Sequence, residues 1–183
     1  MLFLQSVIDL FYPVLCLHCE NKLVQTEKLI CTFCMLSIPK TNFHNDPSNP
    51  MIRSLQGRFP VEYACAYMNF NKGGIAQSVL HHLKYKGNAN VGAVFGEYFA
   101  KEICNHPFIK KADYLIPVPL HKKKLKKRGY NQSLLICNGM QNILQVSVIE
   151  ALMRISDKET QTHKKRFERW KNVNALLKPI SRL

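Results

Sequence analysis

The stretch "DYLIPVPLHKKKLKKRGYNQ", residues 113–132, joins an apolar run to a dense group of cations and then to a polar step. The run 113–118 predicts a short strand that ends around Pro117 and Pro119, because proline cannot donate to a strand ladder. Helical periodicity begins near residue 130 and continues to about 144. The cations therefore stand between the carboxyl end of a strand and the N-terminus of a helix, where open α/β sheets bind ligands.

The sequence on both sides extends this alternation of strands and helices. Hydrophobic periodicity predicts a strand at 61–70, helices at 75–85 and 91–104, and a strand at 146–149. This order favours a parallel α/β sheet for residues 61–183. Residues 41–60, which are rich in Pro, Asn and Ser, are interpreted as a linker, and residues 1–40 as a helix followed by a cysteine module.

The chain is strongly basic, with 26 Lys and Arg against 12 Asp and Glu and a formal net charge of +14. Such a charge favours nucleic acid, phosphorylated substrates or acidic surfaces as partners. No apolar run is long enough for a transmembrane segment, and the opening residues lack the basic start of a signal peptide. We therefore expect a cytoplasmic protein whose seven cysteines are not paired in disulfides.

Four of the cysteines form the pattern C-x2-C-x11-C-x2-C, namely Cys16, Cys19, Cys31 and Cys34. Two such knuckles direct four thiolates at one tetrahedral ion, so the pattern predicts a closed, structural zinc site. The alternative is four unrelated buried cysteines, which the paired spacing disfavours. The three remaining cysteines lie in apolar runs and are interpreted as core residues: Cys65, Cys104 and Cys137.

The cation run itself predicts an anion-binding elbow. Helix N-terminal amides with cations alongside attract anions, here the side chains of Lys123, Lys124, Lys126, Lys127 and Arg128. Gly129 allows the backbone to turn, Tyr130 offers a face for stacking, and Asn131 and Gln132 can cap the helix and reach a polar ligand. The alternative is a solvated lysine loop followed by an ordinary helix cap.

Two further patches place cations beside aromatic side chains, a combination that suits single-stranded nucleic acid. The first contains Lys84 and Lys86 around Tyr85. The second, residues 161–172, contains five cations around Phe167 and Trp170. The alternative for this second patch is an amphipathic helix with both aromatic side chains packed inward.

Taken in order, the two knuckles, "HHLKYKG", "IPVPLHKKKLKKRGYNQSLL" and "LMRISDKETQTHKKRFERWKNVNAL" resemble the ComF family of competence proteins and their relative GntX. The resemblance implies a zinc module joined to a type I phosphoribosyltransferase domain, with a role in natural transformation and DNA uptake. It also implies affinity for single-stranded DNA and phosphoribosyl pyrophosphate, with DNA-uptake proteins as partners. The site positions that it carries over are Lys84, Tyr85, Arg128, Gly129, Tyr130, Asn131, Gln132, Gln161, Arg166, Arg169 and Asn172.

The chain departs from this family in one respect that concerns catalysis. The family continues with a hydrophobic strand, two adjacent aspartates and a phosphate-binding loop, whereas no two acidic residues are adjacent here. We therefore expect an incomplete phosphoribosyltransferase-like domain, which alone is inactive and which would use magnesium only if that loop were supplied. The second hypothesis is a non-catalytic, zinc-stabilised module that binds nucleic acid or a protein.

Overall fold

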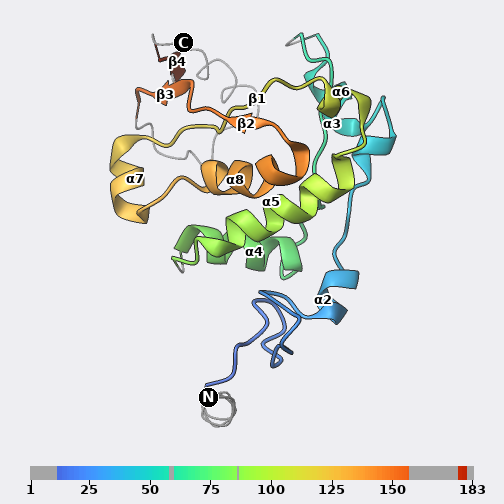
Figure 1. The fold of residues 1–183 in the computed structure, drawn as a ribbon, viewed down its shortest axis with the longest axis vertical. Coiled ribbons are helices and arrows are strands. Elements are labelled where there is room, and N and C mark those ends of the chain that lie inside the picture. The colour runs from blue at the N-terminus through green and yellow to red at the C-terminus, as the bar shows by residue number, and fades with distance from the viewer. Residues whose placement is uncertain (1–11, 58–59, 86, 157–176, 181–183) are drawn as a thin grey trace. The chain divides into compact units, whose positions relative to one another are not determined.

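The structure is a computed structural model that describes residues 12–57, 60–85, 87–156 and 177–180 (Figure 1). The chain divides into two compact units, residues 1–86 and 87–183, and each is described by itself below. Residues 61–85, which the sequence analysis assigns to the C-terminal domain, cluster with the N-terminal unit. The three-part division stays a prediction, and the helix expected before Pro13 lies outside the described residues.

The N-terminal unit contains short helices: α2 (Thr32–Leu36), the 3-10 helix η1 (Phe43–Asn45), α3 (Pro50–Leu55) and α4 (Ile75–Tyr85). The linker interpretation of residues 41–60 is therefore incomplete, because this segment holds η1 and α3. Asn49 explains why it folds. This buried side chain caps α3 by accepting from the N–H groups of Met51 and Ile52, and it donates to the Ala64 carbonyl at 2.9 Å.

The strand predicted at residues 61–70 is wrong. The segment makes only one isolated bridge, between Lys40 and Met68, with hydrogen bonds from Thr41 N to Tyr67 O and from Asn69 N to Pro39 O. Its β-branched and aromatic residues favour extended backbone. The partner segment turns away at once into η1, so no ladder forms.

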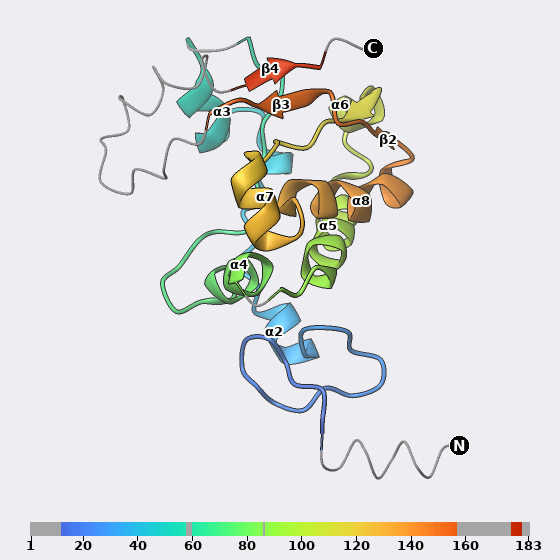
Figure 2. The ribbon, with the colours of Figure 1, turned by 90° about the vertical axis from the view of Figure 1, so that its left-hand side faces the viewer.

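The C-terminal unit mixes helices with small sheets. Its helices are α5 (Asn90–Ile103), α6 (Pro107–Lys110), α7 (Lys122–Arg128) and α8 (Gln132–Leu144). Its strands are β1 (Tyr114–Leu115), β2 (Ser147–Val148), β3 (Leu152–Arg154) and β4 (Leu177–Pro179). The expected parallel pairing is confirmed at small scale, because Tyr114 pairs with Ser147 and Leu115 with Val148 in parallel. The antiparallel β3–β4 pair was not predicted (Figure 2).

Helices α5 and α8 form the centre of this unit and lie on one side of the parallel sheet (Figure 1). Two glycines bring their backbones together. A Cβ on Gly96 would stand 2.2 Å from the Ile136 carbonyl oxygen, and one on Gly139 would stand 1.9 Å from that of Ala93. No larger residue fits at either position, so the two glycines fix how closely the helices approach.

The sequence places α4, α5 and α8 well. Helix α4 has the predicted bounds, α5 begins and ends within one residue of them, and α8 starts two residues later than expected. The cation run is different, because it forms helix α7 where a loop was expected. Within the described parts of the chain, no helix has the length and apolarity needed to cross a membrane.

Candidate functional site

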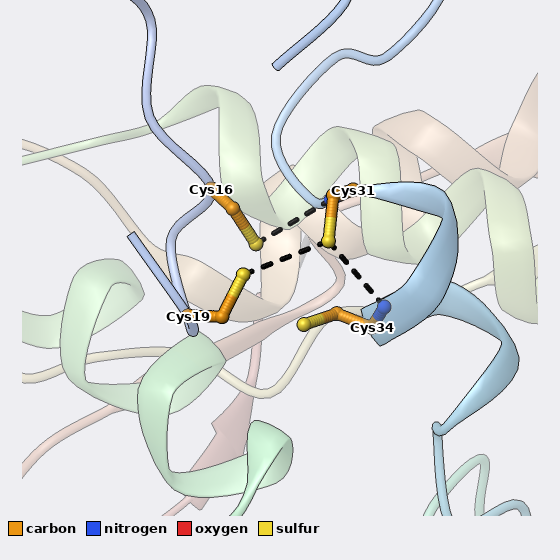
Figure 3. Close-up of side chains that lie close together, drawn as sticks. All are labelled: Cys16, Cys19, Cys31 and Cys34. Carbon is orange, nitrogen blue, oxygen red and sulfur yellow. Dashed lines mark hydrogen bonds between the residues drawn. The ribbon is translucent and has the colours of Figure 1, made fainter. Parts of the chain in front are cut away.

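The first candidate site is the cysteine cluster of the N-terminal unit (Figure 3). Cys16 and Cys19 stand on a tight turn closed by a hydrogen bond from Glu20 N to the Cys16 carbonyl, with Glu20 at a φ of 61°. Cys31 is the N-cap of α2, and Cys34 lies in the first turn of that helix. A turn and a helix start therefore present the two pairs of thiols to each other.

A hydrogen-bonded loop connects the two knuckles. The Glu27 carboxylate accepts from Val24 N at 3.0 Å and from the N–H and hydroxyl of Thr32 at 2.6 and 2.7 Å. These hydrogen bonds hold the pKa of the Glu27 carboxyl below its ordinary value, and the bond from Val24 N has the largest effect. The Leu17 N–H also donates to the Leu29 carbonyl. The second knuckle is thereby fixed beside the first without a disulfide.

The four sulfur atoms fit a metal ion. They lie within 4.8 Å of one another, and the Sγ atoms of Cys19 and Cys31 are 3.6 Å apart. Tetrahedral zinc with bonds of about 2.3 Å requires sulfurs roughly 3.8 Å apart. Backbone N–H groups also point at the sulfurs, from Cys31 to Cys16 at 3.4 Å and from Cys34 to Cys31 at 3.5 Å. The cluster is therefore compatible with a structural metal site.

The pKa values of these thiols also favour a metal site. Burial acts to raise the pKa of Cys16, but hydrogen bonds from the backbone of Cys19, Cys31 and His18 outweigh it and lower that pKa to about 6. Burial raises the pKa of Cys34, and the neighbouring thiols add to the effect. Four adjacent thiolates repel one another, so the set ionises fully only around a cation.

The histidine of the first knuckle and the three remaining cysteines have different environments. His18 donates to or accepts from the Ser78 hydroxyl at 2.9 Å through Nδ1, so this nitrogen is engaged away from the thiols. The three cysteines interpreted as core residues are only partly buried: Cys65, Cys104 and Cys137. All seven cysteines are free thiols.

The second candidate site is the basic elbow of the C-terminal unit, where α7 runs into α8. His121 caps α7 by accepting from Lys123 N at 3.3 Å, and Gly129 ends it at a φ of 80° with its N–H on the Leu125 carbonyl. Gly129 therefore makes the expected turn. The solvated lysine loop is corrected to a helix, because a histidine cap before the run and a glycine after it provide both ends.

Asn131 and Gln132 hold the elbow together. Asn131 is buried and caps α8 by accepting from Ser133 N at 3.0 Å, while its Nδ2 donates to the Val118 carbonyl at 3.1 Å. The Gln132 side chain accepts from the Arg128 guanidinium at 3.1 Å. The expected cap is thus formed by Asn131, whereas Gln132 links the two helices.

A cavity of about 700 Å³ opens beside the elbow. Much of its wall is apolar and includes Leu120, Leu125, Leu134 and Leu152. Its polar and charged lining comes from His121, Lys122, Tyr130, Asn131, Glu150 and Arg154. The space thus combines cationic groups with an apolar wall, which suits a ligand with both an anionic and an apolar part.

The helical form of α7 divides the cations between two faces. Lys122, Leu125 and Gly129 line the cavity at helical spacing. The predicted residues Lys123, Lys124, Lys126 and Lys127 do not line it and occupy the remaining faces of α7. The cavity brings together Lys122, which belongs to the predicted cation run, and Arg154, which was not predicted. The helical period within the run points to Lys122, but no local signal points to Arg154 on β3.

The remaining predicted residues belong to the N-terminal unit or lie outside the described residues. Lys84 and Tyr85 form the exposed end of α4 in the N-terminal unit. Five predicted positions lie outside the described residues: Lys86, Gln161, Arg166, Arg169 and Asn172. Their contribution to the site stays a prediction.

Comparison of the chain with protein-family models, with curated proteins and with solved structures gives no match. The assignment of a function therefore depends on the cysteine cluster and the elbow themselves.

Proposed function

We propose that this protein is a ComF-like, zinc-stabilised module that binds single-stranded DNA through its basic elbow. The observation that carries the proposal is the charge of α7, in which six of seven residues are cations and the first turn has no acidic residue. Like charges four residues apart destabilise a helix by about 0.2–0.5 kcal/mol per pair. Here three such pairs occur: Lys122–Lys126, Lys123–Lys127 and Lys124–Arg128. An anionic ligand along the helix relieves this repulsion.

An extended polyanion fits this helix better than a single phosphate does. The four lysines outside the cavity present charge around α7, whereas one small anion neutralises one or two cations. Tyr130, half-buried at the edge of the cavity, gives a base a surface on which to stack. The resemblance to competence proteins supports single-stranded DNA as this polyanion and DNA uptake as its setting.

The test is a fluorescence-anisotropy titration of the intact, zinc-loaded chain with a single-stranded oligonucleotide at several salt concentrations. Each phosphate neutralised contributes about −0.7 to the slope of log affinity against log salt. Replacing Lys123, Lys124, Lys126 and Lys127 with Ala should weaken binding and flatten this slope. A control with the same change in charge replaces four exposed lysines elsewhere: Lys22, Lys72, Lys101 and Lys178. A wild-type slope in the folded elbow variant, or an equal loss in the control, would contradict the proposal.

A second candidate function concerns the cavity, whose Lys122, His121 and Arg154 favour a small phosphorylated ligand. The family resemblance points to phosphoribosyl pyrophosphate. Apolar wall residues beside Lys122 and Arg154 suit the sugar or base of such a ligand. Thermal unfolding with and without phosphoribosyl pyrophosphate tests this candidate, and an unchanged melting temperature at millimolar ligand contradicts it.

The metal site has a structural role in this proposal. Four thiolates complete a tetrahedral shell and leave no open position for substrate or water. When bound, zinc supplies a cross-link between the two knuckles, and its binding free energy adds to the folding free energy of the module. We propose zinc because sulfur ligands in this geometry select it over magnesium or calcium.

A further inference from the structure

The parallel sheet of the C-terminal unit has two unlike faces. Leu115 of β1 and Val148 of β2 are register partners, and both are partly covered on the side where α8 contacts β2. Their neighbours Tyr114 and Ser147, also register partners, are exposed. Because side chains alternate along a strand, the second pair belongs to the opposite face.

This exposed face continues beyond β1 as a row of large apolar side chains. Tyr114, Ile116 and Val118 are 57%, 47% and 59% exposed, and they alternate with Pro117 and Pro119, which are buried. Parallel sheets occur in proteins almost only with both faces covered, usually by helices. Tyr114 belongs to β1, and Ile116 and Val118 follow the strand, so the row extends the uncovered face of the parallel pair and is a surface that a helix would cover.

The charge around this row indicates what kind of helix covers it. Lys110 and Lys111 precede the row, with one acidic residue, Asp113, between them and Tyr114, and the six cations of α7 follow it. The chain as a whole carries +14, with only 12 acidic residues among 183, so two copies repel each other. A helix with an apolar stripe and acidic flanks is complementary to both the row and its cationic ends.

We propose that Tyr114, Ile116 and Val118 form a docking surface for an acidic amphipathic helix of a partner protein. None of the three side chains lines the cavity beside the elbow, so this surface is distinct from the cavity, while the cations of α7 flank both. The neighbouring lysines speed the encounter and set its orientation, and the apolar row supplies the contact.

The probe is a fluorescein-labelled synthetic peptide of 18 residues, with Leu along one helical face and Glu on the other positions. We expect it to bind the zinc-loaded full chain. Ile116→Ser with Val118→Ser should weaken binding at least tenfold without a change in charge. The matched control is Val14→Ser with Val24→Ser, which alters two equally exposed valines of the N-terminal unit and should bind as wild type does. A peptide with Lys in place of Glu should not bind.

Three outcomes would overturn the docking surface. The first is equal binding of the acidic peptide by wild type and by the folded Ile116 and Val118 variant. The second is failure of the peptide to bind the wild-type chain. This outcome overturns the proposal even if sedimentation shows that the row instead joins two copies of the chain. The third is loss of oligonucleotide binding in the same variant, which would assign the row to the nucleic-acid site. Because the variant keeps all elbow lysines, failure of the docking surface and failure of the DNA proposal are distinguishable.

Discussion

The side-chain amide of Asn131 donates to the carbonyl oxygen of Val118 across 3.1 Å, and so ties the helix α8 to the extended segment that leaves β1. The same side chain caps α8 through its oxygen. The bond to Val118 joins the segment before α7 to the residue that follows it, so the two segments that flank α7 are held together. The geometry of the elbow therefore depends on a residue that carries no charge.

The first prediction separates these two bonds. Asn131→Ala removes both and should lower the free energy of unfolding by about 1–3 kcal/mol, because the Val118 carbonyl and the helix N–H lose their partners. Asn131→Asp keeps the cap but loses the donor, so it should cost less than alanine does. Thermal and urea unfolding measure both effects. An Asn131→Asp protein that is as stable as wild type would show that the bond to Val118 contributes nothing.

The second prediction concerns the contact between α5 and α8. Gly139→Ala would place a methyl group 1.9 Å from the Ala93 carbonyl oxygen, so the helices must separate. Overpacking of this kind costs typically 1–3 kcal/mol, against the gain in helix propensity of up to 1 kcal/mol from replacing glycine. Asn138→Ala, at the preceding exposed position, is the control and should be neutral or stabilising. A Gly139→Ala protein that unfolds like the control would contradict the close packing.

Helices α4, α5 and α8 could be predicted because their apolar residues repeat with the period of a helix. Ile75, Val79 and Leu83 are buried on α4 at the spacing that predicts it. The cysteine cluster could be predicted equally well, because each C-x2-C pair brings two thiols together through local backbone geometry. These features depend on residues close in the sequence, which is why spacing reveals them.

The features that the sequence did not reveal depend on residues distant in the chain. Residues 61–70 have the composition of a strand, yet the segment opposite them turns into η1 after one bridge. The strand β3 pairs with β4 from another part of the sequence, so the place of Arg154 beside the cavity had no local signal. Helix α7 is an exception, because its signals are local: His121 caps its start and Gly129 ends it, but the run of lysines between them was interpreted as a loop.

The third prediction concerns the metal. Purified protein should contain close to one equivalent of zinc by elemental analysis, and Cys16→Ser with Cys19→Ser should abolish it. Structural zinc sites contribute about 10–16 kcal/mol of apparent binding energy in small domains, so a chelator should also unfold the cysteine module. Cys104→Ser is the matched control, since its thiol donates to the Lys101 carbonyl and is distant in sequence from the cluster. Metal-free wild type, prepared without chelators, would disprove the site.

Acid should release this zinc, because protons compete for the thiolates. The hydrogen bonds on Cys16 favour its thiolate down to a pH of about 6, whereas the raised pKa of Cys34 means that this thiol is ionised near neutral pH only by the metal. Retention should therefore fall as the pH drops below neutrality, measured by a colorimetric zinc indicator after dialysis. Zinc content that does not change between pH 7 and pH 4 would argue against ligation by thiolates.

The last prediction uses the two faces of α7 to separate its two candidate ligands. Lys122 lines the cavity, whereas Lys123, Lys124, Lys126 and Lys127 do not. Lys122→Ala with Arg154→Ala should therefore abolish a thermal shift caused by phosphoribosyl pyrophosphate, and should change the salt slope for single-stranded DNA by only about one phosphate contact. The four-lysine variant should show the reverse, with a large loss in the DNA slope and a retained thermal shift.

Tyr130→Ala should weaken DNA binding by roughly 1–3 kcal/mol per stacked base without changing the slope. If both multiple variants lose both ligands in equal proportion while remaining folded, α7 is one undivided cationic surface and the cavity is not a separate site.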